Sequence, residues 1–163
     1  MHPILLKSVN LFDPEPKGVC DLFLCGGIVA AVGKNLSPAL PDVEVVDGSG
    51  LTALPGLVDQ HVHFTGGGGE CGFRSRVPEL SLTDFTTAGV TTAVGLLGTD
   101  SATRSPKSLL AKTKALNEEG ITAYCLTGAY DVPSPTVTGS LKDDVAFLSE
   151  VLGVKVALSD HRG

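Results

Sequence analysis

Short apolar segments separated by turn residues fill the first third of the chain. Gly26-Gly27 stands between two of these segments and matches the two-residue turn that a β-hairpin prefers. Residues 13–18 contain two prolines and a glycine, which predicts a turn there. These features indicate an all-β unit, either a small sheet or half of a β-sandwich. The predicted strands are residues 4–12, 19–25, 28–32 and 43–47.

Beyond a boundary near Pro55-Gly56, predicted strands alternate with predicted helices. This order indicates an α/β unit, a parallel sheet with right-handed crossovers. The sheet is either an open doubly wound sheet or part of a (β/α)8 barrel, which takes about 250 residues when complete. The predicted strands are residues 57–64, 90–96, 121–126 and 154–158, and the predicted helices are residues 81–88, 106–119 and 141–151.

The second predicted helix has the clearest ends. Ser105 is expected to cap its first turn, Pro106 suits the first helical position, and Gly120 suits the residue just past its end. Ser81 and Ser140 are expected to cap the other two helices.

The composition excludes several classes of protein. Hydrophobic residues are 42% of the 163 residues and charged residues 18%, which is too apolar for a disordered chain. Acidic residues outnumber basic residues by 18 to 12, and no basic patch is present, so nucleic acid is not an expected partner. No apolar run approaches the roughly 20 residues that a membrane span requires. We therefore expect no membrane partner either.

The cysteines are scattered and form no C-x-x-C pair. We interpret them as reduced, mostly buried thiols of a cytoplasmic protein rather than as zinc ligands or redox groups. They are Cys20, Cys25, Cys71 and Cys125.

His61 and His63 give the sharpest local signal for chemistry. Side chains alternate along a strand, so these two imidazoles face the same way, with Cα atoms about 7 Å apart. Neutral imidazole is a common zinc ligand, although two histidines at this spacing are also found solvated or in a core. Their position favours a metal site, because ligands gather at the C-terminal ends of parallel strands.

A run of glycines, Gly66 to Gly69, follows directly and ends at Glu70. Glycines let backbone N–H groups approach a ligand closely. The run is not a phosphate loop, because no G-K-[ST] sequence follows it. The Glu70 carboxylate disfavours an anionic ligand and suits a cationic amine. The alternative is a flexible surface loop that binds nothing.

Lys155 interrupts the last predicted strand, which is expected to be buried on both faces. Burial makes an ammonium costly and lowers its pKa, so that a neutral amine becomes available. A neutral amine can react with CO2 to give a carbamate, an anion able to bridge two metal ions. The alternative is a lysine at the edge of the sheet whose head reaches water.

Three more side chains follow predicted strands. Thr99 is placed to hydrogen-bond a substrate, and Tyr130 to donate its O–H to a developing oxyanion. The planar guanidinium of Arg162 suits a substrate carboxylate. The sequence by itself favours an ordinary loop position for Thr99 and Tyr130. His161 can be a surface histidine and is assigned no ligand role.

Several segments extend the pattern that begins at the two histidines. Residues 55–63 read PGLVDQHVH, and together with the other segments they resemble the metallo-type isoaspartyl dipeptidases of the amidohydrolase superfamily. The likeness covers almost the whole chain. The other segments are residues 66–70, 95–100, 109–113, 115–120, 126–130, 153–155 and 159–162.

The resemblance implies a fold and a reaction. The fold is a (β/α)8 barrel with a small β domain, and the reaction is hydrolysis of the β-aspartyl bond of isoaspartyl dipeptides. Two zinc ions in the barrel mouth generate a bridging hydroxide that attacks the scissile carbonyl. His61 and His63 match ligands of one zinc, and Lys155 matches the carboxylated lysine that bridges both. The resemblance also implies a homo-oligomer.

The resemblance further assigns substrate contacts. Glu70 matches the residue that binds the free α-amino group, and Tyr130 matches the catalytic residue that polarises the scissile carbonyl. The other residues that match substrate contacts are Gly68, Gly69, Thr99 and Arg162.

The resemblance also requires ligands that this chain lacks, namely two more histidines and an aspartate that acts as general base. We therefore interpret residues 1–56 as an incomplete small β domain and residues 57–163 as the first half of the barrel. We expect this chain alone to be an inactive portion of the enzyme. The alternatives are a related amidohydrolase acting on cyclic amides or N-acyl amino acids, and a non-catalytic fragment.

Overall fold

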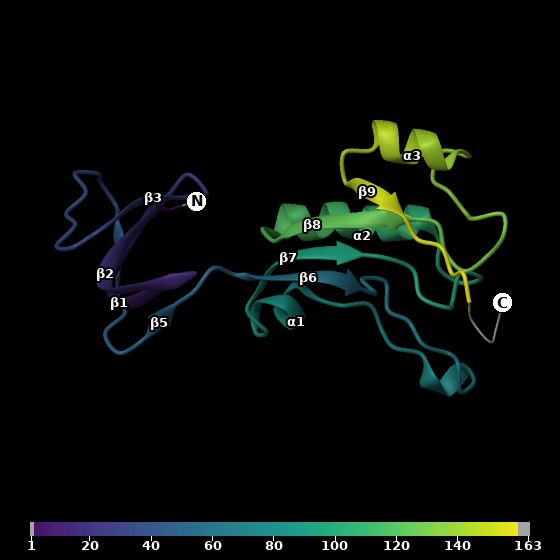
Figure 1. Cartoon of the computed structure of the whole chain (residues 1–163), viewed down its shortest axis with the longest axis horizontal. Coiled ribbons are helices and arrows are strands. Elements are labelled where there is room, and N and C mark those ends of the chain that lie inside the picture. The colour runs from purple at the N-terminus through teal and green to yellow at the C-terminus, as the bar shows by residue number, and fades with distance from the viewer. Residues whose placement is uncertain (1, 160–163) are drawn as a thin grey trace. The chain divides into compact units, whose positions relative to one another are not determined.

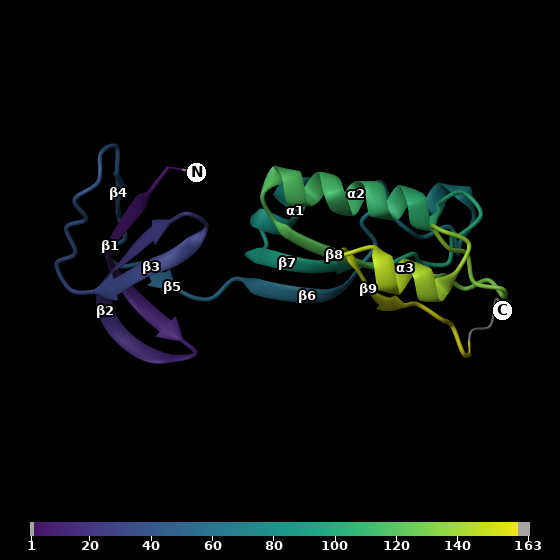
Figure 2. The same cartoon turned by 90° about the horizontal axis from the view of Figure 1, so that it is seen from above.

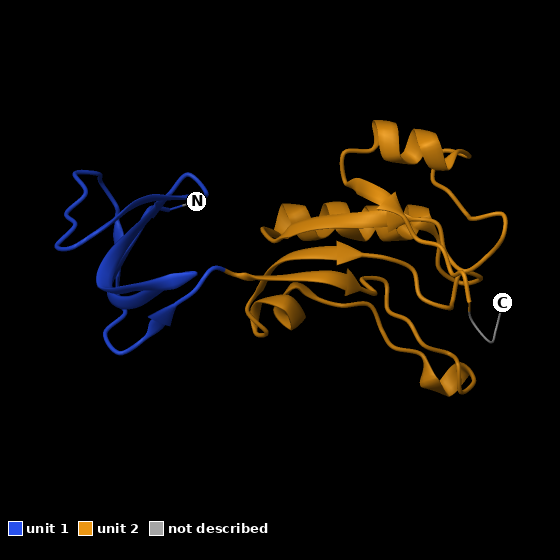
Figure 3. Ribbon diagram, in the orientation of Figure 1, with its two compact units in different colours: residues 1–55 blue, residues 56–163 orange. Residues whose placement is uncertain are grey.

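Two units of different architecture follow one another along the chain, residues 1–55 and residues 56–163 (Figure 3). The computed structural model describes residues 2–159. The first unit contains only strands and the second alternates strands with helices. Whether they are the incomplete β domain and the half barrel of the sequence analysis stays a prediction.

The first unit is one five-stranded sheet with the order β3-β2-β1-β4, in which β5 also pairs with β1 (Figures 1 and 2). β1 and β2 are antiparallel, as are β2 and β3, whereas β4 and β5 run parallel to β1. Half of a sandwich therefore stays a prediction. The strands are β1 (Ile4–Asp13), β2 (Glu15–Cys25), β3 (Ile28–Gly33), β4 (Glu44–Asp47) and β5 (Thr52–Ala53).

Of the two turns predicted in this sheet, one is confirmed and the other differs in extent. Gly26 and Gly27 have φ angles of 62° and 80°, the left-handed conformation of a primed hairpin turn, which confirms the predicted hairpin. The predicted turn at 13–18 is wrong in extent, because Asp13 already pairs with Glu15 and β2 begins there. Irregular register between β1 and β2 accommodates this tight reversal.

The second unit confirms the predicted α/β alternation and parallel sheet. Its four strands have the order β6-β7-β8-β9, and all point the same way (Figure 1). α1 packs on β7, α2 on β8, and α3 on β8 and β9. The elements are β6 (Leu57–Val62), the 3₁₀ turn η1 (Phe73–Ser75), α1 (Leu82–Thr86), β7 (Val90–Gly95), α2 (Pro106–Glu119), β8 (Thr122–Thr127), α3 (Leu141–Phe147) and β9 (Val151–Val154).

The core of the second unit lies between the sheet and α1 and α2. Phe64 is fully buried after β6 and meets Phe85 of α1 edge to face, with ring centroids 5.7 Å apart. Leu109 and Leu116 of α2 are also fully buried. Burying a side chain of this size contributes about 1.5–3 kcal/mol, so this core fixes the sheet whose C-terminal edge holds the predicted site.

The predicted helix ends are confirmed in α2. The Ser105 hydroxyl accepts a hydrogen bond from the Ser108 backbone N–H, and Pro106 is the first helical residue. Gly120 ends the helix with a φ of 109°, which a residue with a side chain rarely adopts.

The C-terminal boundaries differ from the prediction. α3 ends at Phe147 rather than near residue 151, because Leu148 is already extended. β9 spans Val151–Val154 rather than residues 154–158, and Lys155 follows the strand instead of interrupting it. The expectation that Lys155 is buried within a strand is therefore wrong, since its side chain is only half-buried at the strand's C-terminal end.

All four cysteines are free, as the scattered spacing predicts. Cys20 and Cys125 are buried and Cys71 is exposed, so the thiols are not mostly buried. Burial raises the pKa of the Cys125 thiol, which makes it a poor nucleophile. Among the helices within residues 2–159, none has the length and apolar character to cross a membrane.

Candidate functional site

The two histidines lie together at the C-terminal end of β6. Their ring centroids are 5.4 Å apart, and the ring planes are inclined by 78°. The pKa of His61 is lowered by burial, and the positive charges of Lys155 and His63 lower it further against the opposing charge of Asp59. The lowered pKa favours neutral imidazole, the form that binds a metal.

A backbone contact orients His63. Its Nδ1 lies 2.9 Å from the carbonyl oxygen of Leu96, which follows β7. A carbonyl can only accept, so Nδ1 donates, and in the neutral form of the ring Nε2 has the lone pair. Gly98 leaves space beside that nitrogen, since a Cβ at Gly98 would come within 3.3 Å of Nε2. His63 is thus held in the orientation and tautomer of a metal ligand.

Lys155 approaches the same edge of the sheet from β9. Its backbone N–H donates to the carbonyl of Thr127 at the end of β8, at 2.7 Å. Its Nζ lies 5.2 Å from the centre of the Tyr130 ring. The charge of Lys155 also acts on His61, so the structure brings both predicted imidazoles, the lysine and the tyrosine to one end of the sheet.

The donor chemistry at this edge fits a zinc ion. Two imidazoles supply nitrogen ligands, whereas Lys155 fits only in a form that has lost its ammonium proton, because an ammonium has no lone pair. Across residues 2–159, no cluster of three or more histidine, cysteine, aspartate or glutamate side chains is arranged to hold a metal. The described residues therefore supply part of a ligand set.

The glycine run opens a loop whose second arm, at residues 75–77, runs back beside the first. Gly68 has a φ of 77°, and a Cβ there would lie 2.4 Å from the backbone oxygen of Ser75. Gly66 is equally confined, since its Cβ would lie 2.2 Å from the backbone oxygen of Val77. Only glycine allows the two arms of the loop to approach so closely.

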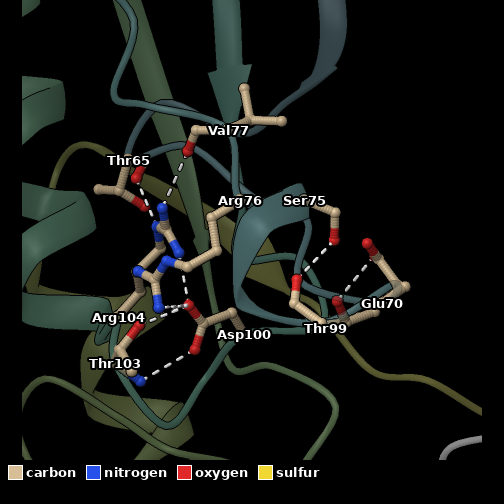
Figure 4. Close-up of polar contacts among 10 residues, drawn as sticks. Thr65, Glu70, Ser75, Arg76, Val77, Thr99, Asp100, Thr103 and Arg104 are labelled. Atoms are coloured by element: carbon tan, nitrogen blue, oxygen red, sulfur yellow. Dashed lines mark hydrogen bonds and ion pairs between the residues drawn. The ribbon is translucent and has the colours of Figure 1, made fainter.

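A cavity of about 250 Å³ lies between this loop and the segment after β7. The Thr99 hydroxyl donates to Glu70 Oε1 at 2.9 Å on its wall (Figure 4). Four of the predicted substrate residues therefore meet at one cavity, while Arg162 lies outside the described residues. The lining residues are Gly68, Gly69, Glu70, Phe73, Arg76, Thr99, Asp100, Ala102 and Thr103.

The sequence analysis gave no role to an ionic group on the wall of this cavity. Asp100 lies between the guanidinium groups of Arg76 and Arg104 (Figure 4). The pKa of Asp100 is lowered by hydrogen bonds from Thr103 and by the two arginine charges, against the effect of partial burial. Arg104 follows Asp100 by four residues in a segment that is not helical, and nothing local in the sequence connects Arg76 to them.

Comparisons with solved structures find a close likeness over the whole chain. A β-aspartyl dipeptidase from Fervidobacterium islandicum, solved with the dipeptide β-Asp-Leu, is 44% identical with a TM-score of 0.90. The match covers 100% of this chain and 43% of that one. A dihydroorotase is 21% identical with a TM-score of 0.64 over 98% of this chain, which shows a shared fold. The chain therefore spans less than half of the dipeptidase.

Comparisons with curated proteins find shorter matches. A dihydroorotase from Solibacter usitatus is 38% identical over 64 residues, 38% of this chain and 14% of that protein. A D-phenylhydantoinase from Escherichia coli is 38% identical over 61 residues, 37% of this chain and 13% of that protein. No protein-family model matches. Together with the imidazole pair at the end of β6, these likenesses support the amidohydrolase superfamily for this chain.

Proposed function

We propose that the whole protein to which these residues belong hydrolyses the β-aspartyl bond of isoaspartyl dipeptides. The observation that supports this most strongly is the 44% identity to a β-aspartyl dipeptidase along all of this chain. A dinuclear zinc centre, a homo-oligomer and a cytoplasmic location are parts of the same proposal.

The metal site is proposed at the C-terminal edge of the second sheet. His61 and His63 would hold a zinc ion through their ring nitrogens, and Lys155 would add a ligand in the form of a carbamate. The neutral Lys155 amine adds to CO2 through its nitrogen and releases one proton. Bound zinc supplies Lewis-acid activation of water and of a carbonyl.

The neighbouring groups of this chain orient the substrate. The Glu70 carboxylate accepts hydrogen bonds from the cationic α-amino group of the aspartyl residue. Thr99 and the backbone of Gly68 and Gly69 line the same cavity. Tyr130 donates its hydroxyl hydrogen to the oxygen of the scissile carbonyl as negative charge develops there. Arg162 is proposed to bind the C-terminal carboxylate of the dipeptide.

A second candidate is hydrolysis of a cyclic amide. The curated matches to a dihydroorotase and a D-phenylhydantoinase favour it. Cyclic amides of this kind carry no free α-amine, so they give the Glu70 carboxylate no cationic partner. The charge at Glu70 therefore favours the dipeptide.

A substrate panel separates these candidates. The protein expressed from its complete reading frame is incubated with zinc and with β-Asp-Leu, α-Asp-Leu, dihydroorotate or hydantoin, and product is measured by chromatography. We expect hydrolysis of β-Asp-Leu alone. Turnover of a cyclic amide without turnover of β-Asp-Leu would replace the first candidate by the second.

Replacing Glu70 with glutamine tests the amine contact. The substitution keeps the size of the side chain and removes its charge, so the KM for β-Asp-Leu is expected to rise about 10-fold, as for loss of one charged hydrogen bond. Succinyl-leucine is the same molecule without the α-amine, and its inhibition constant is expected to stay within about two-fold of its original value. Equal losses for both compounds would show that Glu70 does not read the amine.

A further inference from the structure

The loop at residues 65–77 is held internally by hydrogen bonds between its own backbone groups and by the Ser75 hydroxyl. Residues 70–74 are exposed, and glycine-rich backbone loses more conformational entropy on ordering than other backbone. Its two arms are joined where the Val77 N–H donates to the Gly67 carbonyl at 2.8 Å and the Gly69 N–H donates to the Ser75 carbonyl at 3.4 Å. These two hydrogen bonds form the single bridge between Gly68 and Arg76. Yet the loop has to present the Glu70 carboxylate at a fixed place in the cavity.

Arg104 fastens both ends of this loop. Its Nε donates to the carbonyl of Thr65, where the loop begins, and its Nη2 donates to the carbonyl of Val77, where the loop ends, at 3.0 Å (Figure 4). The Arg104 side chain is only 10% exposed. Because the guanidinium is planar, its donors hold the two ends at a fixed separation.

Asp100 joins this arginine to the second arm of the loop. Its Oδ2 pairs with Nη1 of Arg104 and lies 3.1 Å from Nη1 of Arg76. The Thr103 N–H donates to Oδ1 at 3.0 Å, and the Asp100 side chain is 13% exposed. A carboxylate with this many donors is held rigidly.

Thr99, the residue before Asp100, contacts Glu70, the carboxylate that is proposed to bind the substrate amine. Thr99 donates to Glu70, so two consecutive residues of one segment hold the same loop, one through Glu70 and the other through Arg76 (Figure 4). Movement of the loop away from Asp100 would therefore also move Glu70 away from Thr99.

We propose that Asp100 is a positioning residue, which fastens the loop through Arg76 and Arg104 and thereby fixes the Glu70 carboxylate for the substrate amine. This inference rests on the proposed function, since it concerns the same amine contact. In this role Asp100 and the two arginines act through the loop and Glu70 rather than on the reacting atoms.

Arg76→Ala is the decisive variant, because the loss of its charge and the loss of its hold on the loop predict opposite changes in KM. Removing a cation near the cationic amine would strengthen amine binding by Coulomb's law alone. If the loop needs Arg76, the KM for β-Asp-Leu instead rises about 5-fold, while the inhibition constant of succinyl-leucine changes less than about two-fold. Arg76→Lys keeps the positive charge but not the planar guanidinium, and it is expected to recover part of the loss.

Arg74→Ala is the matched control. Arg74 lies on the same loop, is exposed, and forms no ion pair with any residue in the range 2–159. It removes the same charge, and its KM is expected to stay within about two-fold of the unsubstituted protein. An unchanged or lower KM in Arg76→Ala, or an equal rise in Arg74→Ala, overturns the proposal.

Hydrogen exchange of the loop amides separates this inference from the proposed function. Faster exchange across residues 66–77 in Arg76→Ala, but not in Arg74→Ala, supports the fastening by Asp100 even if no dipeptide is hydrolysed. Unchanged exchange in both variants overturns it. Absence of β-Asp-Leu hydrolysis by the unsubstituted protein instead overturns the proposed function and, with it, the role of the loop in amine binding.

Discussion

Replacing Lys155 with alanine is expected to lower kcat/KM for β-Asp-Leu by more than about 100-fold and to reduce bound zinc. Losing a partner that only supports a ligand costs about 10–100-fold, and a bridging ligand should cost more. The expectation follows from the position of Lys155 just after β9. There its positive charge lowers the pKa of His61, and its ammonium lies over the Tyr130 ring. Steady-state kinetics and zinc content measured on the same samples test it.

Lys142→Ala is the control for this variant. Lys142 is an exposed lysine of α3, so its loss removes the same charge without changing the edge of the sheet. Zinc-free protein is then reloaded in ¹³C-bicarbonate, and a carbamate carbon signal is expected with the unsubstituted protein and with Lys142→Ala but not with Lys155→Ala. Full zinc content and turnover in Lys155→Ala would show that the carbamate assignment is wrong.

Features with local causes were predicted well from the sequence. The boundaries of α2 follow from Ser105, Pro106 and Gly120, each of which acts on backbone groups within one turn of itself. The hairpin at Gly26-Gly27 follows from two positive φ angles that adjacent glycines adopt freely. These elements could therefore be predicted without information on the elements that pack against them.

The position of β9 depends on a distant strand and was predicted wrongly. Residues 151–158 are apolar at almost every place, so alternation gives no register. Pairing with β8 decides it instead, since Cys125 pairs with Val151 and Thr127 with Val154. That pairing puts Lys155 just beyond the strand, at the edge where ligands gather in parallel sheets.

The candidate site shows the same division. His61 and His63 were found because two residues of one strand share a face, which is a local property. The ionic group of Arg76, Asp100 and Arg104 was not found, because only the fold brings the loop after β6 beside the segment after β7. A single sequence contains no local signal for such a contact.

Asp144 is expected to be the polar residue on which the last part of the second unit depends most. Its fully buried carboxylate accepts hydrogen bonds from the Thr127 hydroxyl, the Val137 N–H at 2.8 Å, and both the N–H and the hydroxyl of Thr138. Asparagine offers one acceptor oxygen in place of two, and its NH₂ would face donors. Asp144→Asn is therefore expected to lower the free energy of unfolding by about 3 kcal/mol.

The effect of Asp144 should depend on pH in one direction. Burial alone would raise the pKa of this carboxyl, but hydrogen bonds from Thr127, Thr138 and Val137 outweigh it and hold the pKa below its usual range. A pKa that is lower in the folded state stabilises the protein above the unfolded value of about 3.9, and the contribution is lost as the pH falls below it. The difference in stability between the unsubstituted protein and Asp144→Asn should therefore shrink below about pH 4.

Urea unfolding of Asp144→Asn and Asp143→Asn tests the expected loss of stability, and zinc binding by the same variants tests whether Asp144 supports the candidate site. Asp143 lies beside Asp144 in the first turn of α3, so both variants lose the same charge near the same helix end, and Asp143→Asn should change stability by only about 0.5 kcal/mol. Thr127, held by Asp144, also accepts the backbone hydrogen bond of Lys155. Weakened zinc binding in Asp144→Asn alone would show that the buried carboxylate supports the metal-binding edge, whereas equal destabilisation by both variants would assign the effect to the helix end.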